Sequence, residues 1–204
     1  MRLGLLGGTF DPIHRGHLVT AQSVREQLAM DEVWFLPTGL PWMKRGEPLS
    51  AARHRRAMVE LAVQWHEGFA VCVVELERSG ETYTVDTLED LRVLRGAEDE
   101  LFFIMGADTL EGFHQWKAPV RILELATVVV ASRPGYGETG LQELERALPG
   151  ASEHIVMVRT PLVEVSGSEL RCRVAEGQSI REMVPDAVAA YVEAHGLYRE
   201  DAKA

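Results

Sequence analysis

The chain has 204 residues, of which 46% are hydrophobic and 25% charged, and its formal net charge is −10 at pH 7. This length and composition predict one globular domain, residues 1–204, with a sizeable core. The negative charge argues against broad nucleic-acid binding, which favours a basic face, and no apolar run approaches the length of a membrane span.

The sequence indicates neither a signal peptide nor a disulfide. An apolar strand begins at Leu3, and Cys72 and Cys172 are interpreted as reduced thiols. We therefore expect a cytoplasmic protein that binds small molecules and has no nucleic-acid or membrane partner. The sequence leaves open whether the chain forms a homo-oligomer.

The first informative stretch is a short apolar strand that runs into a glycine turn and then into a helix. Residues 3–6 are apolar, the glycines at 7–8 allow a ligand to lie directly on the main chain, and residues 17–28 have helical apolar spacing. His14 and His17 stand three positions apart at the start of this helix, so both face one side of its first turn. Unpaired amides and the positive end of the helix dipole make this a natural anion site.

Other uses of this turn fit the sequence less well. A zinc site needs further ligands, and neither cysteine lies in a CxxC pattern. The glycine spacing in residues 4–8 does not match G-x-G-x-x-G, and the Gly-Lys-Ser/Thr of a P-loop is absent from the chain. A capping role for the histidines leaves the presence of Thr9, Asp11 and Arg15 in the same turn unexplained. We therefore predict a phosphate site and no metal site.

The run from residue 7 to residue 17, GGTFDPIHRGH, resembles the signature of the HxGH nucleotidyltransferase superfamily. It is most similar to the form found in the bacterial nicotinate-nucleotide adenylyltransferase family, and the resemblance extends over about residues 3–171. It implies that ATP lies across the turn and that the two histidines contact its phosphates. The ATP contacts that we assign to the turn are Gly7, Gly8, Thr9, Phe10 and His17.

A second strand is predicted at 32–37, followed by a loop over 38–50 that is long enough to act as a lid. The resembled family has a Pro-Pro-His-Lys-like sequence here. This chain has Pro41-Trp42-Met43-Lys44, which keeps the lysine but loses the second proline and the histidine. We take Lys44 as a candidate phosphate ligand, with a solvated surface lysine as the alternative.

Ser50 is predicted to cap a helix over 51–64. Its basic run at 53–56 spreads over more than one helix face, which favours solvated side chains over a substrate site. Residues 69–74 are apolar and rich in valine, as expected for a central parallel strand.

The stretch 79–89 reads as a turn followed by a helix that Thr84 or Asp86 could cap. It also resembles the family motif Ser-Gly-x-x-Tyr-Thr-x-Asp-Thr-Leu. The resemblance implies that Tyr83 and Thr84, with Thr82 beside them, hold the carboxylate of a nicotinate ring.

A fourth strand is predicted at 100–105, and the glycine and acid that follow it are a plausible ribose site. Gly-Ala-Asp followed by a tryptophan is similar to the family pattern. It implies nucleotide contacts from Gly106 and Asp108, stacking of the nicotinate ring near Trp116, and a backbone amide of Lys117 at the same carboxylate.

Strands are predicted at 126–131 and 155–158, with a weak helix at 141–147 between them. The turn after the first of these strands contains Arg133, which we assign to the ATP site.

The next helix begins at Ser166, which has capping-box spacing to Glu169 and carries Arg171 on its first turns. In a parallel sheet this start faces the edge that carries His14 and His17, and we assign Ser166 and Arg171 to the ATP phosphates. The family has Ser or Thr where this chain has Gly167, so one hydroxyl is missing.

Strands alternate with helices throughout, which predicts a single doubly wound α/β domain: a mostly parallel, six-stranded, Rossmann-like nucleotidyltransferase sheet with helices on both faces. The last helix starts at Pro185, ends near 196–198 and is expected only to pack. Ligands bind such sheets beyond the carboxyl ends of the strands, where the strand order reverses.

The resemblance implies transfer of the adenylyl group of ATP, which binds Mg²⁺, to nicotinate mononucleotide, giving nicotinate adenine dinucleotide and pyrophosphate. The implied catalytic residues are His14, His17, Lys44 and Arg171. Enzymes of the same superfamily that act on nicotinamide mononucleotide, pantetheine phosphate or a cytidylyl acceptor remain open, as does a nucleotide-sensing module without turnover.

Overall fold

The computed structural model describes residues 1–42, 48–96, 98–132 and 138–199. Its centre is a six-stranded sheet in the order β4-β2-β1-β6-β7-β8, and a separate two-stranded ladder joins β3 to β5. The strands are β1 (Arg2–Gly8), β2 (Glu32–Pro37), β3 (Leu40–Pro41), β4 (Phe69–Val71), β5 (Glu81–Thr82), β6 (Glu100–Gly106), β7 (Thr127–Ser132) and β8 (Ile155–Arg159). All strand pairs among the described residues are parallel, which confirms the predicted doubly wound sheet.

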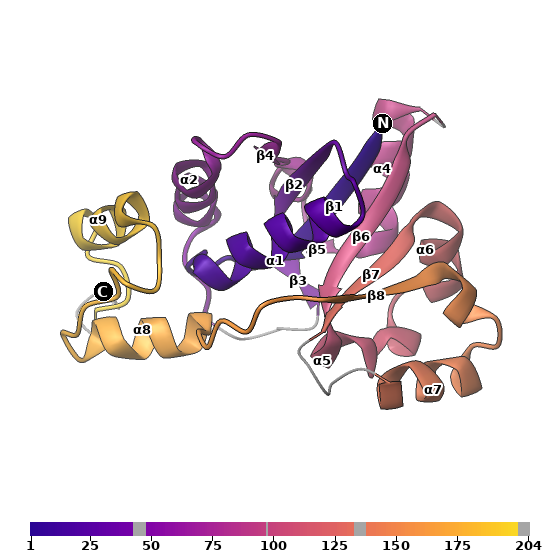
Figure 1. The fold of residues 1–204 in the computed structure, drawn as a ribbon. Helices are drawn as coiled ribbons and strands as arrows, with labels where there is room; N and C mark the ends of the chain where they lie inside the picture. Colours follow the sequence, from indigo (N-terminus) through magenta and orange to yellow (C-terminus); the bar gives the residue numbers. More distant parts are fainter. Residues whose placement is uncertain (43–47, 97, 133–137, 200–204) are drawn as a thin grey trace.

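Helices cover both faces of this sheet (Figure 1). They are α1 (Arg15–Gln27), α2 (Ala52–Val63), α3 (Val74–Glu77), α4 (Thr84–Arg95), α5 (Ala107–Leu110), α6 (Pro119–Leu125), α7 (Glu138–Ala147), α8 (Gly167–Ala175) and α9 (Asp186–Ala194), with short 3-10 turns at Phe113–Gln115 and Ala151–His154. Among the described residues, no helix is long and apolar enough to cross a membrane.

Side chains that alternate along the strands divide the core into two layers. On β6, Phe102 and Ile104 pack with buried residues of α1, α2, α8 and α9. Phe103 and Met105 point the other way and pack with α4, α6 and α7. The central strand β6 therefore buries both faces, as expected for a parallel sheet between two helix layers.

The strand order reverses between β1 and β6, because the chain passes from β1 to β2 on one side and later adds β6 on the other. In a doubly wound sheet this reversal opens a crevice at the carboxyl ends of the two strands. Those ends carry Gly7 and Gly8 on β1 and Gly106 on β6, so the fold brings the two glycine segments singled out in the sequence side by side.

The strand predicted at 69–74 is shorter than expected and lies at the edge of the sheet. Only Phe69–Val71 pairs, with β2, and the chain then turns into α3. A run of β-branched residues is compatible with any partly covered strand, so this pattern did not distinguish an edge position from a central one.

Two predicted helix caps are wrong. The N-cap of α2 is Ala51, and the main-chain N–H of Ser50 instead donates to Asp11. The N-cap of α4 is Tyr83, without a capping side chain, and Asp86 lies inside the first turn. The carboxylate of Asp86 instead pairs with Lys117 at 2.8 Å.

The prediction that the basic run at 53–56 is solvated fails at Arg55, which is only 2% exposed. Its guanidinium donates to the main-chain carbonyls of Ser50 (3.0 Å), Thr9 (2.9 Å), Thr38 (2.7 Å) and Gly39 (3.2 Å). One buried cation therefore ties together the glycine turn, the end of β2 and the start of α2.

We expect Arg55→Met to lower the free energy of unfolding by about 3 kcal/mol or more, because these buried carbonyls lose charge-assisted hydrogen bonds. Urea unfolding followed by circular dichroism measures this. The matched control is Arg56→Met on the same helix, where the exposed ion pair with Glu60 is lost and a change of only about 0.5 kcal/mol is expected. Equal effects of the two substitutions would contradict a bracing role for Arg55.

Candidate active site

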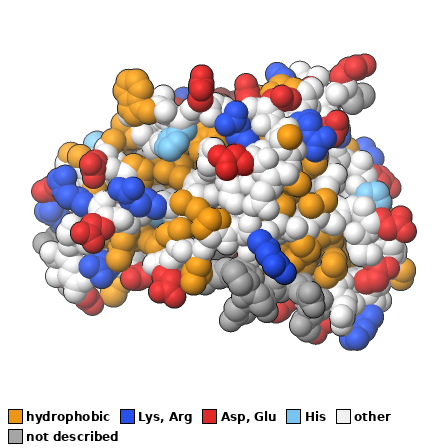
Figure 2. Space-filling view, in the orientation of Figure 1, with side chains coloured by type: hydrophobic (Ala, Val, Ile, Leu, Met, Phe, Trp, Pro, Cys, Tyr) orange, Lys and Arg blue, Asp and Glu red, His pale blue; other side chains and the backbone are white. Residues whose placement is uncertain are grey.

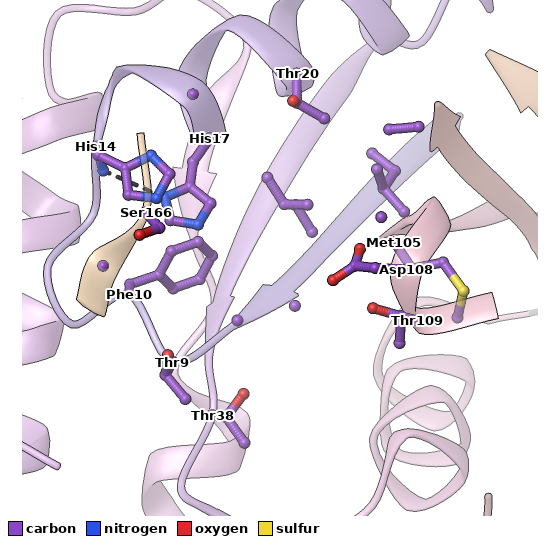
Figure 3. Close-up of a pocket in the computed structure, with 18 of the residues that line it drawn as sticks. Thr9, Phe10, His14, His17, Thr20, Thr38, Met105, Asp108, Thr109 and Ser166 are labelled. Carbon is purple, nitrogen blue, oxygen red and sulfur yellow. Dashed lines mark hydrogen bonds between the residues drawn. The ribbon is translucent and has the colours of Figure 1, made fainter. Parts of the chain in front are cut away.

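A cleft with a volume of about 870 Å³ lies at the carboxyl ends of β1 and β6. Small-ligand sites typically occupy about 300–1,000 Å³, so this cleft is large enough for a nucleotide. Its lining includes the sequence-predicted residues Gly7, Gly8, Thr9, Phe10, His14, His17, Thr82, Thr84, Gly106, Asp108, Trp116, Ser166 and Arg171. Figure 3 shows His14, His17 and Ser166 on one side of the strand ends, with Asp108 and Thr109 on the other.

The two histidines form a stacked pair at the start of α1. Their ring centroids are 3.7 Å apart at an interplanar angle of 21°, which confirms that both face one side of the first turn. The main-chain N–H of His14 donates to His17 Nδ1 over 3.2 Å. Since Nδ1 accepts this bond, a neutral His17 carries its proton on Nε2, which remains a donor for a ligand.

Both imidazoles are neutral at pH 7 in the free protein. Burial lowers the pKa of His14 to about 4. Burial and the neighbouring His14 ring lower the pKa of His17 well below its usual value. The positive potential for a polyanion therefore comes from Arg171 and from helix N-termini, whereas the histidines act as neutral donors until a charged ligand raises their pKa.

The ring of Phe10 packs against the histidine pair at His17. It is 1% exposed, and its ring meets that of His17 edge-on at a centroid distance of 5.0 Å. Its φ of +48° lies in the left-handed region, which is uncommon for a residue with a Cβ and indicates that the surrounding packing determines the shape of the turn.

Arg171 reaches the same cleft from α8. Its Nη1 donates to the main-chain carbonyl of Asp11 (2.7 Å) and its Nη2 to Ser168 Oγ (3.2 Å). Ser166 caps α8 by accepting from the N–H of Glu169 at 3.2 Å, as predicted. The positive end of α8 and a tethered guanidinium are thus brought beside the histidine pair.

Close packing explains why this chain has glycine at position 167, where the resembled family has Ser or Thr. A Cβ there would lie 3.1 Å from the main-chain carbonyl oxygen of Asp11 and 3.4 Å from Arg171 Nη1. Glycine therefore allows α8 to approach the histidine turn closely, at the loss of one hydroxyl.

On the opposite rim, β6 ends at Gly106 and α5 follows at once. A Cβ on Gly106 would overlap the carboxylate of Asp108. The absence of that Cβ lets Asp108, which is exposed, fold back over the strand end and present acceptor oxygens to the cleft (Figure 3).

The far end of the cleft contains Thr82, Thr84, Trp116 and a buried acid that the sequence did not reveal. Glu75 is 7% exposed and accepts a hydrogen bond from Thr87 Oγ1 at 3.0 Å. Burial raises the pKa of Glu75. It lies in a sequence stretch, VVELE, where no local pattern distinguishes a buried carboxyl from a solvated one.

Two predicted residues lie just outside the cleft. Tyr83 and Lys117 line a neighbouring pocket of about 350 Å³ with Trp42 and Gln115. The Lys117 ammonium lies 4.6 Å from the Tyr83 ring centroid and pairs with Asp86 at 2.8 Å. Trp42 lines both cavities and so connects them. Lys44 and Arg133 lie outside the described residues.

Two buried side-chain polar atoms among the described residues have no hydrogen-bond partner, His14 Nδ1 and Trp116 Nε1. Both residues line the cleft, one near each end. Unpaired buried polar atoms are rare because desolvation is unfavourable, so this pair indicates polar ligand groups at both ends.

Several lining residues were not singled out from the sequence. Thr20 projects from α1, Thr38 follows β2, and Met105 and Thr109 flank the end of β6 (Figure 3). Thr38, Met105 and Thr109 lie near strand ends, which could have been used as a signal, whereas Thr20 lies within α1. Within the described part of the chain, no group of three or more His, Cys, Asp or Glu side chains could hold a metal ion.

The lowered pKa of His14 makes stability depend on pH. The unfolded chain takes up a proton near pH 6.5 and the folded chain only near pH 4, so stability present above pH 6.5 is lost as the pH falls towards 4. One pKa unit corresponds to about 1.4 kcal/mol. As the pH falls over this range, the free energy of unfolding of His14→Asn should therefore decrease by up to about 3 kcal/mol less than that of the wild type. Urea unfolding across the range measures this, with the exposed His154→Asn as control. Parallel curves for His14→Asn and the wild type would contradict the burial of His14.

Comparison with known proteins places the chain among nucleotidyltransferases. Residues 5–173 match the cytidylyltransferase-like family model. The chain is 43% identical over 198 residues to a probable nicotinate-nucleotide adenylyltransferase of Dehalococcoides mccartyi, covering 97% of each chain. It is 46% identical to the protein of that name from Thermomicrobium roseum, covering 97% of this chain and 92% of the relative.

The fold is also similar to that of a solved structure, the Plasmodium falciparum nicotinic acid mononucleotide adenylyltransferase complexed with NaAD. The TM-score is 0.76, with 18% identity and 97% of each chain covered. Together with the stacked histidines at the start of α1 and Arg171 beside them, these matches show that the chain belongs to the cytidylyltransferase-like family and, within it, to the nicotinate-nucleotide adenylyltransferases.

Proposed function

We propose that this protein transfers the adenylyl group of ATP to nicotinate mononucleotide, giving nicotinate adenine dinucleotide and pyrophosphate. The observation that carries the proposal is the convergence of two separate segments on the cleft: residues 7–17, with the glycine turn and the His14–His17 pair, and α8, with Arg171. The names of the relatives at 43% and 46% identity support the choice of acceptor.

In this reaction a 5′-phosphate oxygen of the acceptor attacks the α-phosphorus of ATP, and the bond from that phosphorus to the β-phosphate bridging oxygen breaks. No protein nucleophile is needed, because both partners are bound side by side and catalysis comes from positioning and charge stabilisation. His14 and His17 are proposed to stabilise the α- and β-phosphates. The Nε2–H of His17 is available for this because its Nδ1 is already engaged.

The leaving pyrophosphate is proposed to lie at α8. There Arg171 retains N–H donors beyond those bound to Asp11 and Ser168, and the Ser166 helix start adds main-chain N–H groups. Lys44 remains a proposed phosphate ligand. Mg²⁺ is proposed to arrive with the triphosphate and to neutralise its charge; the described cleft offers few carboxylates, which suits an ion that keeps substrate phosphates and waters as ligands.

The nucleoside of ATP is proposed to lie across Gly7, Gly8 and the end of β6, with Asp108 accepting hydrogen bonds from the ribose and Arg133 as a further ATP contact. The nicotinate end of the acceptor is proposed to lie between Thr82–Thr84 and Trp116. The unpaired Nε1–H of Trp116 supports this placement, because an acid offers it an acceptor. Tyr83 and Lys117 are proposed to complete that end from the neighbouring pocket.

The function is tested by comparing rates with ATP and either nicotinate or nicotinamide mononucleotide as the only acceptor, following dinucleotide and pyrophosphate by chromatography. A higher rate with the nicotinate compound is expected. A higher rate with the amide or with pantetheine phosphate would assign a different acceptor. Nucleotide binding without pyrophosphate release from any acceptor would indicate a sensor.

We expect His17→Ala to lower kcat by about a hundredfold while ATP still binds, because one donor at the developing charge is typically worth about 3 kcal/mol in the transition state. Steady-state kinetics and a binding titration with ATP measure the two effects. The control is His154→Ala, an exposed histidine far from the cleft lining, which should keep wild-type kinetics. Unchanged turnover in His17→Ala would remove this residue from the mechanism.

We expect Trp116→Phe to raise KM for nicotinate mononucleotide by about tenfold, because the indole N–H is lost while an aromatic ring is kept. KM for ATP should stay near the wild-type value. Trp65→Phe, at a residue that is 88% exposed, controls for loss of a tryptophan elsewhere. A change in KM for ATP alone would place Trp116 at the other substrate.

A further inference from the structure

Asp11 connects the histidine turn to three other parts of the chain, two through its carboxylate and one through its main-chain oxygen. Asp11 is 2% exposed, although it lies in a turn that borders an open cleft. Its Oδ1 accepts from the Tyr198 hydroxyl at 2.6 Å and its Oδ2 from the Ser50 N–H at 3.0 Å. Its main-chain oxygen accepts from Arg171 Nη1 at 2.7 Å.

The contact with Tyr198 is the longest-range of these, joining residues 187 positions apart. Tyr198 follows α9, which Figure 1 places with α8 on the side of the molecule where α1 begins. Its φ of +66° lies in the left-handed region, an unfavourable conformation for tyrosine that its surroundings must enforce. Burial and the adjacent Asp11 raise the pKa of Tyr198, so the phenol stays protonated and keeps its role as donor.

We expected the segment around Tyr198 only to pack, and the hydrogen bond to Asp11 corrects this expectation. The phenol oxygen also lies 3.8 Å from Met58 Sδ of α2, and Tyr198 packs against the core cluster that contains Phe10 and Ile13 of the turn. The hydroxyl donates to the carboxylate of Asp11, and the main-chain oxygen of the same residue accepts from Arg171. A shift of Asp11 would therefore move the histidine turn and the guanidinium anchor together.

We infer that Tyr198 is a positioning residue for adenylyl transfer, acting through Asp11 on His14, His17 and Arg171; this inference rests on the function proposed above. In a reaction without a protein nucleophile, rate depends on placing the phosphates, and a misplacement of about 1 Å can lower the rate by up to about a hundredfold. The acceptor end is built from β5, α4 and Trp116, which do not depend on Asp11. The effect should therefore fall on kcat and on the ATP side.

The test compares Tyr198→Phe with Tyr191→Phe. Each substitution removes one hydroxyl from the same C-terminal region, but the Tyr191 hydroxyl bonds His54 Nδ1 of α2 at 3.0 Å and not the turn. We expect Tyr198→Phe to lower kcat about tenfold, to change KM for ATP and to leave KM for nicotinate mononucleotide unchanged. Tyr191→Phe should keep all three values. Urea midpoints establish that both variants are folded during the assay.

A second variant tests the hydrogen bond between Tyr198 and Asp11 by changing the acceptor. Asp11→Asn keeps the size of the side chain but leaves either Tyr198 or Ser50 without an acceptor, and the same selective loss of kcat is expected. Full kcat in folded Asp11→Asn or folded Tyr198→Phe, or an equal loss in Tyr191→Phe, would overturn the inference. If the wild-type protein transfers no adenylyl group, the proposed function fails instead, which the wild-type assay reveals first.

Discussion

The site depends on how the main chain of the glycine turn is held. Residues 8–14 form neither helix nor strand over most of their length, so their carbonyls need partners from elsewhere. Buried Arg55 supplies donors to Thr9, and Arg171 supplies one to Asp11. Both cations come from helices distant in the sequence, and hydrogen bonds from charged donors are stronger than neutral ones. The shape of the proposed phosphate site is thus determined by long-range contacts, although its sequence signature is local.

This arrangement also explains how an acidic protein receives a polyanion. Figure 2 shows acidic and basic side chains interspersed over the face of Figure 1, so no broad positive field on that face draws in ATP. Among the described residues, the attraction is short-ranged and comes from helix starts and the tethered guanidinium of Arg171. The histidine pair contributes neutral donors, because burial next to each other disfavours two charged rings. Such a site holds phosphate without repelling its own components when empty.

Local patterns predicted much of this molecule: the six strands of the main sheet, the helix that carries both histidines and the Ser166 cap all follow from periodicity and spacing. The segment containing Arg55 was misread because a run of cations looks solvated unless its carbonyl partners are known. Three of these four carbonyls lie in two distant segments, at Thr9 and at residues 38–39. Glu75 and the Tyr198 bond were not foreseen for the same reason. A short stretch of sequence does not show which distant polar group will form a hydrogen bond with a buried polar side chain.

The short ladder between β3 and β5 has a mechanical consequence. Leu40 pairs with Glu81 and Pro41 with Thr82, and Thr82 Oγ1 also donates to the Leu40 carbonyl at 3.4 Å. These pairs join the chain leaving β2 to the segment that lines the far end of the cleft. Main-chain pairing therefore couples residues 40–41 to residues 81–82, so a displacement of either segment would strain the hydrogen bonds of the other.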